Sequence, residues 1–430
     1  MLPPKIWQQT SRIMKALTTG VTAALLAGMT QASPAVVETS IRPIARPAQG
    51  GLPVVEVANQ AFERWIEAFK AKARAEGIDA ALLERAFEGI TYNTTVIQRD
   101  RNQNEFTKTI WDYLDTAASD LRRDNGQKAL AREMKTLTAI EAEYGVPKEI
   151  VTAIWGLESA YGTFKGETDI VEALATLGFD GRRGEFFEAQ LMAAFQILQA
   201  GDTDPRGMTG SWAGAMGHTQ FIPTSYLAHA VDFTGDGKRD IWGDDPTDAL
   251  ASTAAYLADA GWVTGMPWGM EVVLPEGFDY EIAGEHVEKF AAEWNALGVR
   301  DIEGNELPDH GPASIRLPGG AKGAAFLTYG NFMVLERYNT ADAYVIAVGH
   351  LADLIGGGKR IQSGWPREDR ALTLPEREEL QTRLEAAGFD PGGVDGKIGP
   401  KTLAAVRAYQ KSIGVTPDGY ASLHILQKLR

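Results

Sequence analysis

Residues 145–162 read GVPKEIVTAIWGLESAYG, and this stretch decides the fold of the chain around it. Proline is favoured in the first turn of a helix, so Pro147 marks where a helix begins. The apolar positions that follow recur at spacings of four, three and four, and share one helix face: Ile150, Ile154, Leu157 and Tyr161. The stretch therefore predicts a helix with one apolar face.

Glu158 stands beside that face, one turn after Ile154 and close to Trp155 and Tyr161. A carboxyl group held against apolar and aromatic surface loses hydration in its charged form, so its pKa rises. A raised pKa is what a general acid needs near neutral pH. The pattern alone leaves a second interpretation open, in which Glu158 is an ordinary solvated residue near a helix end.

The flanking sequence extends the helical pattern and divides the chain. Helical periodicity from Phe62 to Tyr144, and again over residues 338–354, predicts a mainly α domain at residues 54–355. Short β-prone runs bounded by Gly or Pro predict a small inserted subdomain with strands at Met270–Leu274, Ala313–Leu317 and Ala324–Leu327. The polar, Gly-rich residues 356–370 are typical of a linker. Residues 371–430 are predicted to form an independent small module.

Charge and composition limit which partners the chain can bind and in which cell compartment it can act. The net charge is −15 and no basic stripe is present, which argues against a nucleic-acid partner. The chain has no cysteine, which excludes disulfides, thiol catalysis and a lipidated N-terminal cysteine. Basic residues precede an uncharged run at Ala16–Met29 and a small-residue exit at Ala32. This pattern predicts a signal peptide at residues 1–32, with a short buried helix as the alternative. The Pro- and Ala-rich residues 33–53 then form a tether, and we expect the mature protein to be soluble in a periplasm.

A second segment, residues 210–226, places polar side chains among small residues. Small residues allow a ligand to approach the backbone closely, and Ser211, Gln220 and Tyr226 offer hydrogen-bonding groups for sugar hydroxyls and acetamides. A tight contact between two helices explains the same composition equally well. The segment is therefore a candidate carbohydrate site with a structural alternative.

A third segment resembles the calcium loop of an EF-hand. Oxygen-bearing side chains stand at loop positions 1, 3, 5 and 9, which are Asp232, Thr234, Asp236 and Asp240. Gly237 stands at position 6. Lys238 stands at position 7, where the backbone carbonyl is the usual ligand. Position 12 is Gly243 rather than Glu, so a later carboxylate must complete the shell, and Asp248 is preferred over Asp244 and Asp245. The loop predicts a structural calcium ion, and the alternative is an Asp-Gly turn without metal. No cofactor for catalysis is indicated.

Taken together, these segments resemble the membrane-bound lytic murein transglycosylase B family, from about Phe62 to Leu354. The motifs are the Glu158 helix, DGRRGEFF at residues 180–187, the segment Ser211–Tyr226, the calcium loop, and Arg337-Tyr338-Asn339 followed by Tyr344. The resemblance implies a lysozyme-like helical fold with Glu158 as the catalytic acid and base. It also implies a glycan cleft lined by Arg182, Arg183, Ser211, Gln220, Tyr256, Tyr338, Asn339 and Tyr344.

The same resemblance implies cleavage of peptidoglycan glycan strands without water, so that the muramic acid product ends in a 1,6-anhydro ring. The last sixty residues resemble a three-helix peptidoglycan-binding domain, through GVDGKIGPKTL at residues 393–403 and Tyr409-Gln410.

Two alternatives to the transglycosylase function stay open. A hydrolytic muramidase would need a second carboxylate, such as Asp169, Glu172 or Glu185, whereas a scaffold protein would bind the wall without cutting it. Partners in cell-wall synthesis or division machinery also stay open.

Overall fold

The computed structural model describes residues 54–101 and 108–430. The signal peptide expected at residues 1–32 and the tether expected at 33–53 lie outside the described residues. Within the described part of the chain, no helix has the length and apolar character that crossing a membrane requires.

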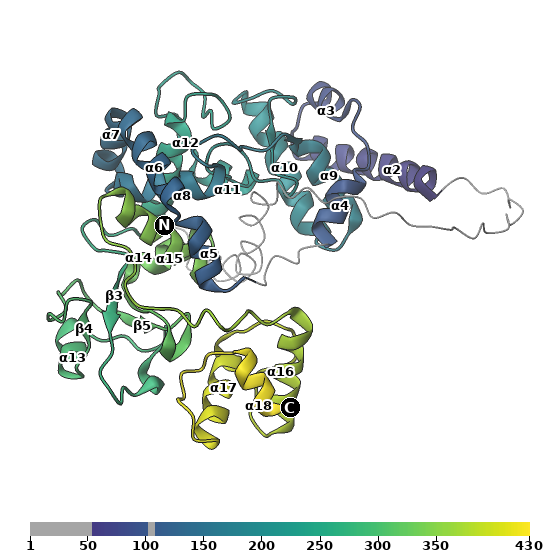
Figure 1. The fold of residues 1–430 in the computed structure, drawn as a ribbon. Helices are drawn as coiled ribbons and strands as arrows, with labels where there is room; N and C mark the ends of the chain where they lie inside the picture. Colours follow the sequence, from purple (N-terminus) through teal and green to yellow (C-terminus); the bar gives the residue numbers. More distant parts are fainter. Residues whose placement is uncertain (1–53, 102–107) are drawn as a thin grey trace, which may run out of the picture.

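The main body is a helical domain built around one large apolar core. Its helices are α2 (Val54–Ala75), α3 (Ala80–Phe87), α4 (Thr94–Arg101), α5 (Ile110–Ala117), α6 (Asp120–Arg132), α7 (Met134–Tyr144), α8 (Lys148–Ser159), α9 (Ile170–Asp180), α10 (Gly184–Ala200), α11 (Pro223–His229), α12 (Thr247–Asp259), α14 (Gly330–Tyr338) and α15 (Asp342–Ile355). Helix α8 lies in the middle of this body, packed against α15, α6 and α12 (Figure 1). The apolar face predicted for residues 150–161 is therefore part of the central core.

Two helices that the periodicity predicts as continuous are broken in the structure. The pattern over Ile110–Leu121 divides into α5 and α6, because Ser119 caps α6 by accepting a hydrogen bond from the Arg122 amide at 3.4 Å. The pattern over residues 338–354 likewise divides, since α14 ends at Tyr338 and Asn339 is extended. A capping side chain therefore interrupts the first run, and an extended residue interrupts the second.

The inserted subdomain is a four-stranded antiparallel sheet in the order β4-β3-β6-β5, with its own apolar core around Trp294, Ile315 and Leu327. Three of its strands match the predicted runs to within a residue or two: β3 (Gly269–Val273), β5 (Ser314–Arg316) and β6 (Ala325–Thr328). The two-residue strand β4 (Arg300–Asp301) and helix α13 (Ala291–Ala296) are too short for a sequence pattern to show. Another pair of two-residue strands, β1 (Thr168–Asp169) and β2 (Thr209–Gly210), joins two loops of the helical domain.

The C-terminal module has three helices, as predicted: α16 (Leu374–Ala386), α17 (Pro400–Ser412) and α18 (Leu423–Leu429). They enclose a small separate core that includes Leu380, Leu384, Val406 and Leu426. A capping box starts α16, in which Thr373 and Glu376 bond each other's backbone amides. The prediction of a mainly helical chain with a β-containing insertion and a three-helix module is confirmed.

The segment predicted as a linker, residues 356–370, packs against the rest of the molecule. Trp365 lies against Trp111 with ring centroids 6.1 Å apart, and Arg367 makes a two-pronged ion pair with Asp115 at 2.7 and 2.9 Å. The module also touches the insertion, where the Ala321 amide donates to the Asp418 carboxylate at 2.8 Å. Figure 1 shows the module beside the insertion. Polar, Gly-rich composition predicted a linker, and Trp365 and Arg367 help to anchor it, together with the Gln362 and Ser363 amides, which donate to Glu271.

Candidate functional site

The C-terminal end of α8 has an uncommon backbone. Ala160 and Tyr161 both have positive φ angles, 49° and 60°, which L side chains seldom adopt. This reversal folds the Tyr161 ring back onto Gly156, where a Cβ atom would lie 2.5 Å from the ring. A side chain at position 156 would therefore displace the Tyr161 ring from this place. Pro147 stands just before the helix, at its N-cap position.

Glu158 lies in the last turn of α8, and only 4% of its surface is exposed. The Tyr344 hydroxyl, from the first turn of α15, donates a hydrogen bond to Oε1 of Glu158 at 2.6 Å. Burial raises the pKa of Glu158 to about 8, although the Tyr344 hydrogen bond acts in the opposite direction. The carboxyl group is therefore mostly protonated at neutral pH and is chemically able to act as a general acid.

Two further tyrosines stand near Glu158. Burial raises the pKa of Tyr113 and Tyr338, and the negative charge of Glu158 raises both further. The Tyr338 hydroxyl donates to the Thr219 carbonyl at 2.6 Å, and its ring lies 5.1 Å from that of Tyr256. Together with Tyr344 they form an aromatic wall around the carboxyl group. Tyr113 was not predicted, because only the packing of α5 against α15 brings it to the site and its own sequence context carries no signal.

The polar side chains of residues 210–226 hold the shape of their own loop. Ser211 Oγ accepts hydrogen bonds from the amides of Ala213 and Ala215. Gln220 has a positive φ angle of 57°, and its side-chain amide donates to the Lys165 and Gly217 carbonyls at 3.0 and 2.8 Å. The Tyr226 hydroxyl donates to the Arg239 carbonyl. The structure thus gives these three side chains internal partners, and a role in binding sugar remains a prediction.

Arg182 and Arg183 share one buried partner, Asp100 of α4, with the shortest contact 2.5 Å for each arginine. They stand in the turn between α9 and α10, and no hydrogen bond or ion pair recorded for either reaches Glu158. Asn339 is buried beside Tyr338, and its Oδ1 accepts from the Ala341 amide at 3.1 Å. The structure therefore brings Tyr338 and Tyr344 near Glu158, and ties the two arginines to α4.

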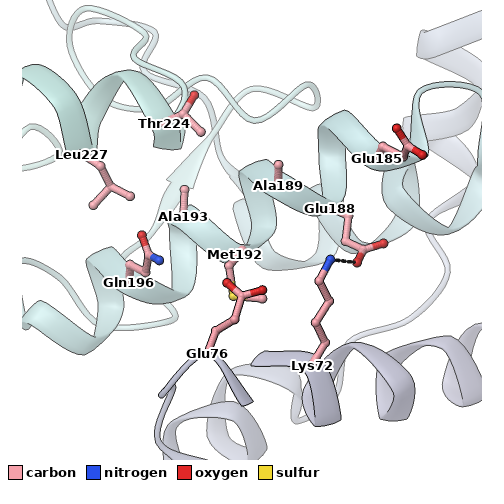
Figure 2. A pocket seen from close by; sticks show the side chains of 10 residues that line it. All are labelled: Lys72, Glu76, Glu185, Glu188, Ala189, Met192, Ala193, Gln196, Thr224 and Leu227. Carbon is pink, nitrogen blue, oxygen red and sulfur yellow. Dashed lines mark hydrogen bonds and ion pairs between the residues drawn. The ribbon is translucent and has the colours of Figure 1, made fainter. Parts of the chain in front are cut away.

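The carboxylates considered as a second catalytic group have other partners. Asp169 caps α9 and pairs with Arg206 at 2.7 Å, and Glu172 accepts from Asn93 at 2.8 Å. Glu185 lines a pocket of about 590 Å³ between α2 and α10 (Figure 2). Among the described residues, no other carboxylate shifts the pKa of Glu158. Within residues 54–101 and 108–430, Glu158 is therefore the candidate acid of this site.

The pocket in Figure 2 is separate from the Glu158 site. Its charged rim includes Lys72, which pairs with Glu188 at 2.7 Å, together with Glu76 and Glu185. None of its lining residues is among the tyrosines around Glu158. It does not contribute to the candidate active site.

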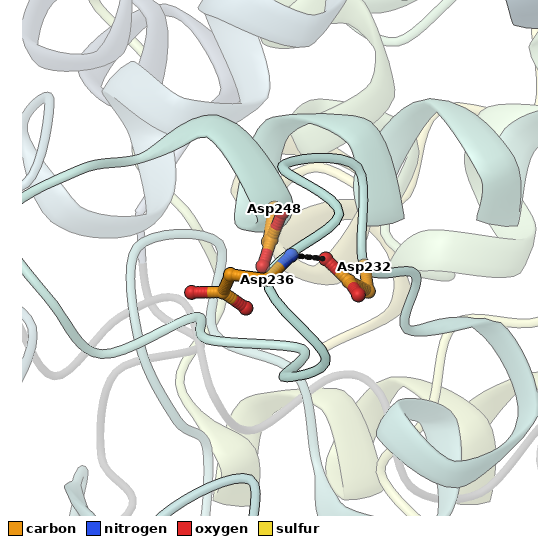
Figure 3. A group of neighbouring side chains, drawn as sticks. All are labelled: Asp232, Asp236 and Asp248. Carbon is orange, nitrogen blue, oxygen red and sulfur yellow. Dashed lines mark hydrogen bonds between the residues drawn. The ribbon is translucent and has the colours of Figure 1, made fainter.

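The predicted calcium loop brings three carboxylates together. Asp232, Asp236 and Asp248 each offer an oxygen, and these oxygens all lie within 4.8 Å of one another (Figure 3). Calcium binds oxygens at about 2.3–2.6 Å, so two ligands on opposite sides of the ion are about 5 Å apart. The spacing therefore fits one coordination sphere. Asp248 comes from α12 and also accepts from the Phe233 and Thr234 amides, and burial raises its pKa.

The other predicted loop ligands are placed differently. Asp240 Oδ1 accepts from the Trp242 and Gly243 amides at 2.8 and 3.0 Å, and Asp240 is not part of the three-carboxylate group. Thr234 donates its hydroxyl to Asp232 at 3.2 Å, and the Lys238 amide donates to Asp236 at 2.9 Å. The side chains of Asp232 and Asp236 therefore converge with Asp248, whereas the side chain of Asp240 caps a turn.

His218 connects this loop to the end of α8. Its Nδ1 accepts from the Trp155 indole at 3.1 Å, so its Nε2 carries the proton and donates to the Gly243 carbonyl at 2.8 Å. The Ser159 hydroxyl donates to the His218 carbonyl at 2.5 Å. Burial lowers the pKa of His218, which keeps the ring neutral. Ser159, the residue after Glu158, is thus connected through His218 to Gly243 at the end of the predicted calcium loop. The sequence pattern did not show this connection.

Comparison with known proteins relates this geometry to other chains. The profile of the transglycosylase SLT domain family matches residues 61–353, and that of a peptidoglycan-binding domain family matches residues 373–429. The structure is similar to SltB3 from Pseudomonas aeruginosa, solved in complexes with NAG-anhNAM-pentapeptide and NAG-NAM-pentapeptide. The sequences are 49% identical with a TM-score of 0.84, over 86% of this chain and 100% of SltB3.

Two further similar chains come from Escherichia coli. The lytic transglycosylase Slt35, solved in complex with calcium, is 30% identical with a TM-score of 0.58, over 69% of this chain and 93% of that one. Membrane-bound lytic murein transglycosylase B is 38% identical over 219 residues, which is 49% of this chain and 58% of that protein. The chain therefore matches little more than half of the length of this relative.

Proposed function

The chain belongs to the transglycosylase SLT domain family, and from that premise we propose that it is a lytic transglycosylase of peptidoglycan. It cleaves the β-1,4 bond between N-acetylmuramic acid and N-acetylglucosamine. The observation that carries the proposal is the buried, protonated Glu158, held by Tyr344 with no second carboxylate acting on it among the described residues. The SltB3 complexes with muropeptide ligands support this substrate class.

The proposed reaction needs one carboxyl group because the substrate supplies the nucleophile. Ordinary glycosidases use two carboxyl groups, one as acid and one as base or nucleophile. Here Glu158 donates its proton to the glycosidic oxygen as the bond from that oxygen to muramic acid C1 breaks, which frees the N-acetylglucosamine 4-hydroxyl. The Glu158 carboxylate then accepts the proton of the muramic acid C6 hydroxyl, and O6 bonds to C1. The acid is restored, no water is consumed, and the product is a 1,6-anhydro ring.

The aromatic wall has two functions in this proposal. The Tyr344 hydroxyl stabilises the Glu158 carboxylate that forms midway, since a hydrogen bond to a charged group strengthens as charge develops. The wall of Tyr113, Tyr338 and Tyr344 excludes water that would otherwise compete with the C6 hydroxyl. Tyr256, Asn339, Ser211 and Gln220 remain candidates for the cleft near this wall, and Arg182 and Arg183 for a more distant part of it.

The products decide between transglycosylase and hydrolase. Purified protein incubated with sacculi in ¹⁸O-labelled water is expected to release muropeptides with 1,6-anhydromuramic acid ends and no label at C1. Mass spectrometry of the fragments measures both. Reducing ends that carry the ¹⁸O label would show that the protein is a hydrolytic muramidase. Sacculi that stay intact would show that it binds the wall without cutting it.

Location follows from the substrate. We infer that the protein acts in the cell envelope, and that residues 1–32 export it as a cleaved signal peptide. The expected N-terminus of the mature chain is Ser33, and the intact mass of protein from the periplasmic fraction measures it. A membrane-retained chain with residues 1–32 still attached would contradict this inference.

We also propose that Asp232, Asp236 and Asp248 hold a structural calcium ion, as the complex of the relative Slt35 with calcium suggests. The ion would neutralise three converging carboxylates and stabilise the loop that His218 connects to α8. Calcium at a hundredfold excess over its dissociation constant is expected to stabilise the fold by about 2.7 kcal/mol. Thermal unfolding with chelator and then with added calcium measures the shift in melting temperature.

A matched pair of variants makes the calcium test specific. Asp236→Asn removes one exposed carboxylate of the group and is expected to abolish the calcium-dependent rise in melting temperature. Asp244→Asn changes an exposed carboxylate of the same loop outside the group and is expected to keep it. An equal response in both variants would place the ion elsewhere or exclude it.

A further inference from the structure

The corner between α14 and α15 determines where Tyr344 points. Helix α14 ends at Tyr338, and α15 begins only at Asp342, with Asn339 extended between them. Tyr344 stands two residues into α15, where it reaches Glu158. Because a helix is rigid, the direction in which α15 leaves this corner sets the position of the Tyr344 hydroxyl.

Arg316 bridges the two sides of this corner from outside the helical domain. It lies on β5 of the insertion and is 8% exposed. Its Nη1 pairs with Asp342 of α15 at 2.9 Å, and its Nη2 lies 3.3 Å from Glu336 of α14. The guanidinium also lies over the Phe332 ring of α14, 4.3 Å from the centroid. One planar cation thus contacts both helices.

The charges around Arg316 show why the corner depends on it. Glu285, from a loop of the insertion, is a third carboxylate 3.6 Å from Nη2. The Glu336 side chain is mostly buried, whereas the side chains of Glu285 and Asp342 are 40% and 47% exposed. The three carboxylates repel one another, and burial raises the pKa of Glu336 to about 7. Arg316 offsets this repulsion. Arg316 is itself buried, so removing one of its carboxylate partners leaves its charge less compensated, and its ion pairs add to the core packing of α15 in holding the corner.

We propose that Arg316 is a positioning residue for the reaction, because it fixes the α14–α15 corner so that the Tyr344 hydroxyl bonds Glu158. The inserted sheet then contributes to catalysis by aiming a tyrosine, although the contacts of Arg316 among the described residues include neither Glu158 nor Tyr344. This inference rests on the proposed role of Glu158 as the acid, and it concerns the geometry of Tyr344 rather than the identity of the substrate.

The test measures the Glu158 carboxyl directly, by ¹³C NMR titration of protein labelled at glutamate, with the signal assigned from Glu158→Gln. The Tyr344 hydrogen bond lowers the pKa of Glu158, so its loss must raise that pKa. Asp342→Ala, at a position with a half-exposed side chain, is expected to raise the pKa as Tyr344→Phe does. Arg316→Lys keeps the charge but cannot bridge both helices, and it is expected to act in the same direction.

Glu285→Ala is the matched control, because it also removes a carboxylate from Arg316 but does not touch α14 or α15. It is expected to leave the pKa of Glu158 unchanged. The double variant Asp342→Ala with Tyr344→Phe is expected to show no shift beyond that of Tyr344→Phe, since both changes remove one hydrogen bond. On soluble glycan fragments, Asp342→Ala is expected to lower kcat about tenfold with little change in KM. This is the effect expected when the hydrogen bond from Tyr344 to the charged form of Glu158 is lost.

Three outcomes would overturn the inference: an unchanged Glu158 pKa in Asp342→Ala, an equal shift in Glu285→Ala, or additive shifts in the double variant. The NMR titration needs no turnover, so it decides this inference even if the released fragments contradict the proposed function.

Discussion

Glu158→Gln is expected to lower the release of anhydro-muropeptides from sacculi by at least about a hundredfold, since general acid–base catalysis contributes about 10²–10⁴-fold. Glutamine has nearly the same size as glutamate and can still accept the Tyr344 hydrogen bond. It cannot donate a proton to the glycosidic oxygen or accept one from the C6 hydroxyl. The initial rate of fragment release, followed by chromatography and mass spectrometry, measures the loss.

The control lies on the same helix. Glu149 stands in the first turn of α8, partly exposed beside Lys148, so Glu149→Gln makes the identical chemical change away from the tyrosines. It is expected to keep wild-type turnover. Glu158→Gln is expected to pellet with sacculi as wild type does, and to lose that binding only when residues 371–430 are also removed. Near-normal turnover by Glu158→Gln would end the proposed mechanism.

The second prediction concerns stability and pH. The pKa of Glu158 is about 8 in the folded protein and about 4.5 when the group is in water, so the folded state holds a proton that the unfolded chain releases. Stability from this proton is fully present below about pH 4.5 and is lost as the pH rises through about 8. Between those values the wild-type free energy of unfolding is expected to fall by about 1.4 kcal/mol per pH unit relative to Glu158→Gln.

Denaturant unfolding of both proteins at intervals from pH 5 to pH 9 measures this difference, which amounts to about 4 kcal/mol over three pH units. Other titrating groups cancel, because the two proteins share them. Asp353→Asn is a comparison at an exposed position: the pKa of Asp353 is raised beside Trp268, but solvent screens this carboxyl group, so its removal is expected to give a smaller change with pH than the removal of Glu158. That variant is expected to keep its activity. A difference between wild type and Glu158→Gln that does not vary with pH would show that Glu158 titrates normally.

Much of the fold could be predicted because its signals are local. The spacing of Ile150, Ile154 and Leu157 reports a helix face directly, and turn residues bound the short strands. The same pattern failed to predict two helix breaks, at Ser119, which caps a new helix, and at Asn339, which is extended. The spacing of apolar residues does not show where one helix ends and the next begins. It also missed that Trp365 anchors the segment predicted as a linker.

By itself the sequence determined where most of the longer helices and three strands of the insertion run, which carboxyl group stands on the apolar helix, and which loop carries converging aspartates. Only the tertiary structure decided how Glu158 is surrounded. Tyr344 is 186 residues away from it in sequence, and Tyr113 and Tyr338 come from two further helices. The aspartate that closes the acidic group, and the use of Arg182 and Arg183 to pair Asp100, were settled in the same way. The reason is physical: periodicity and turn chemistry act over a few residues, whereas desolvation and the choice of hydrogen-bond partner depend on which distant segments pack together.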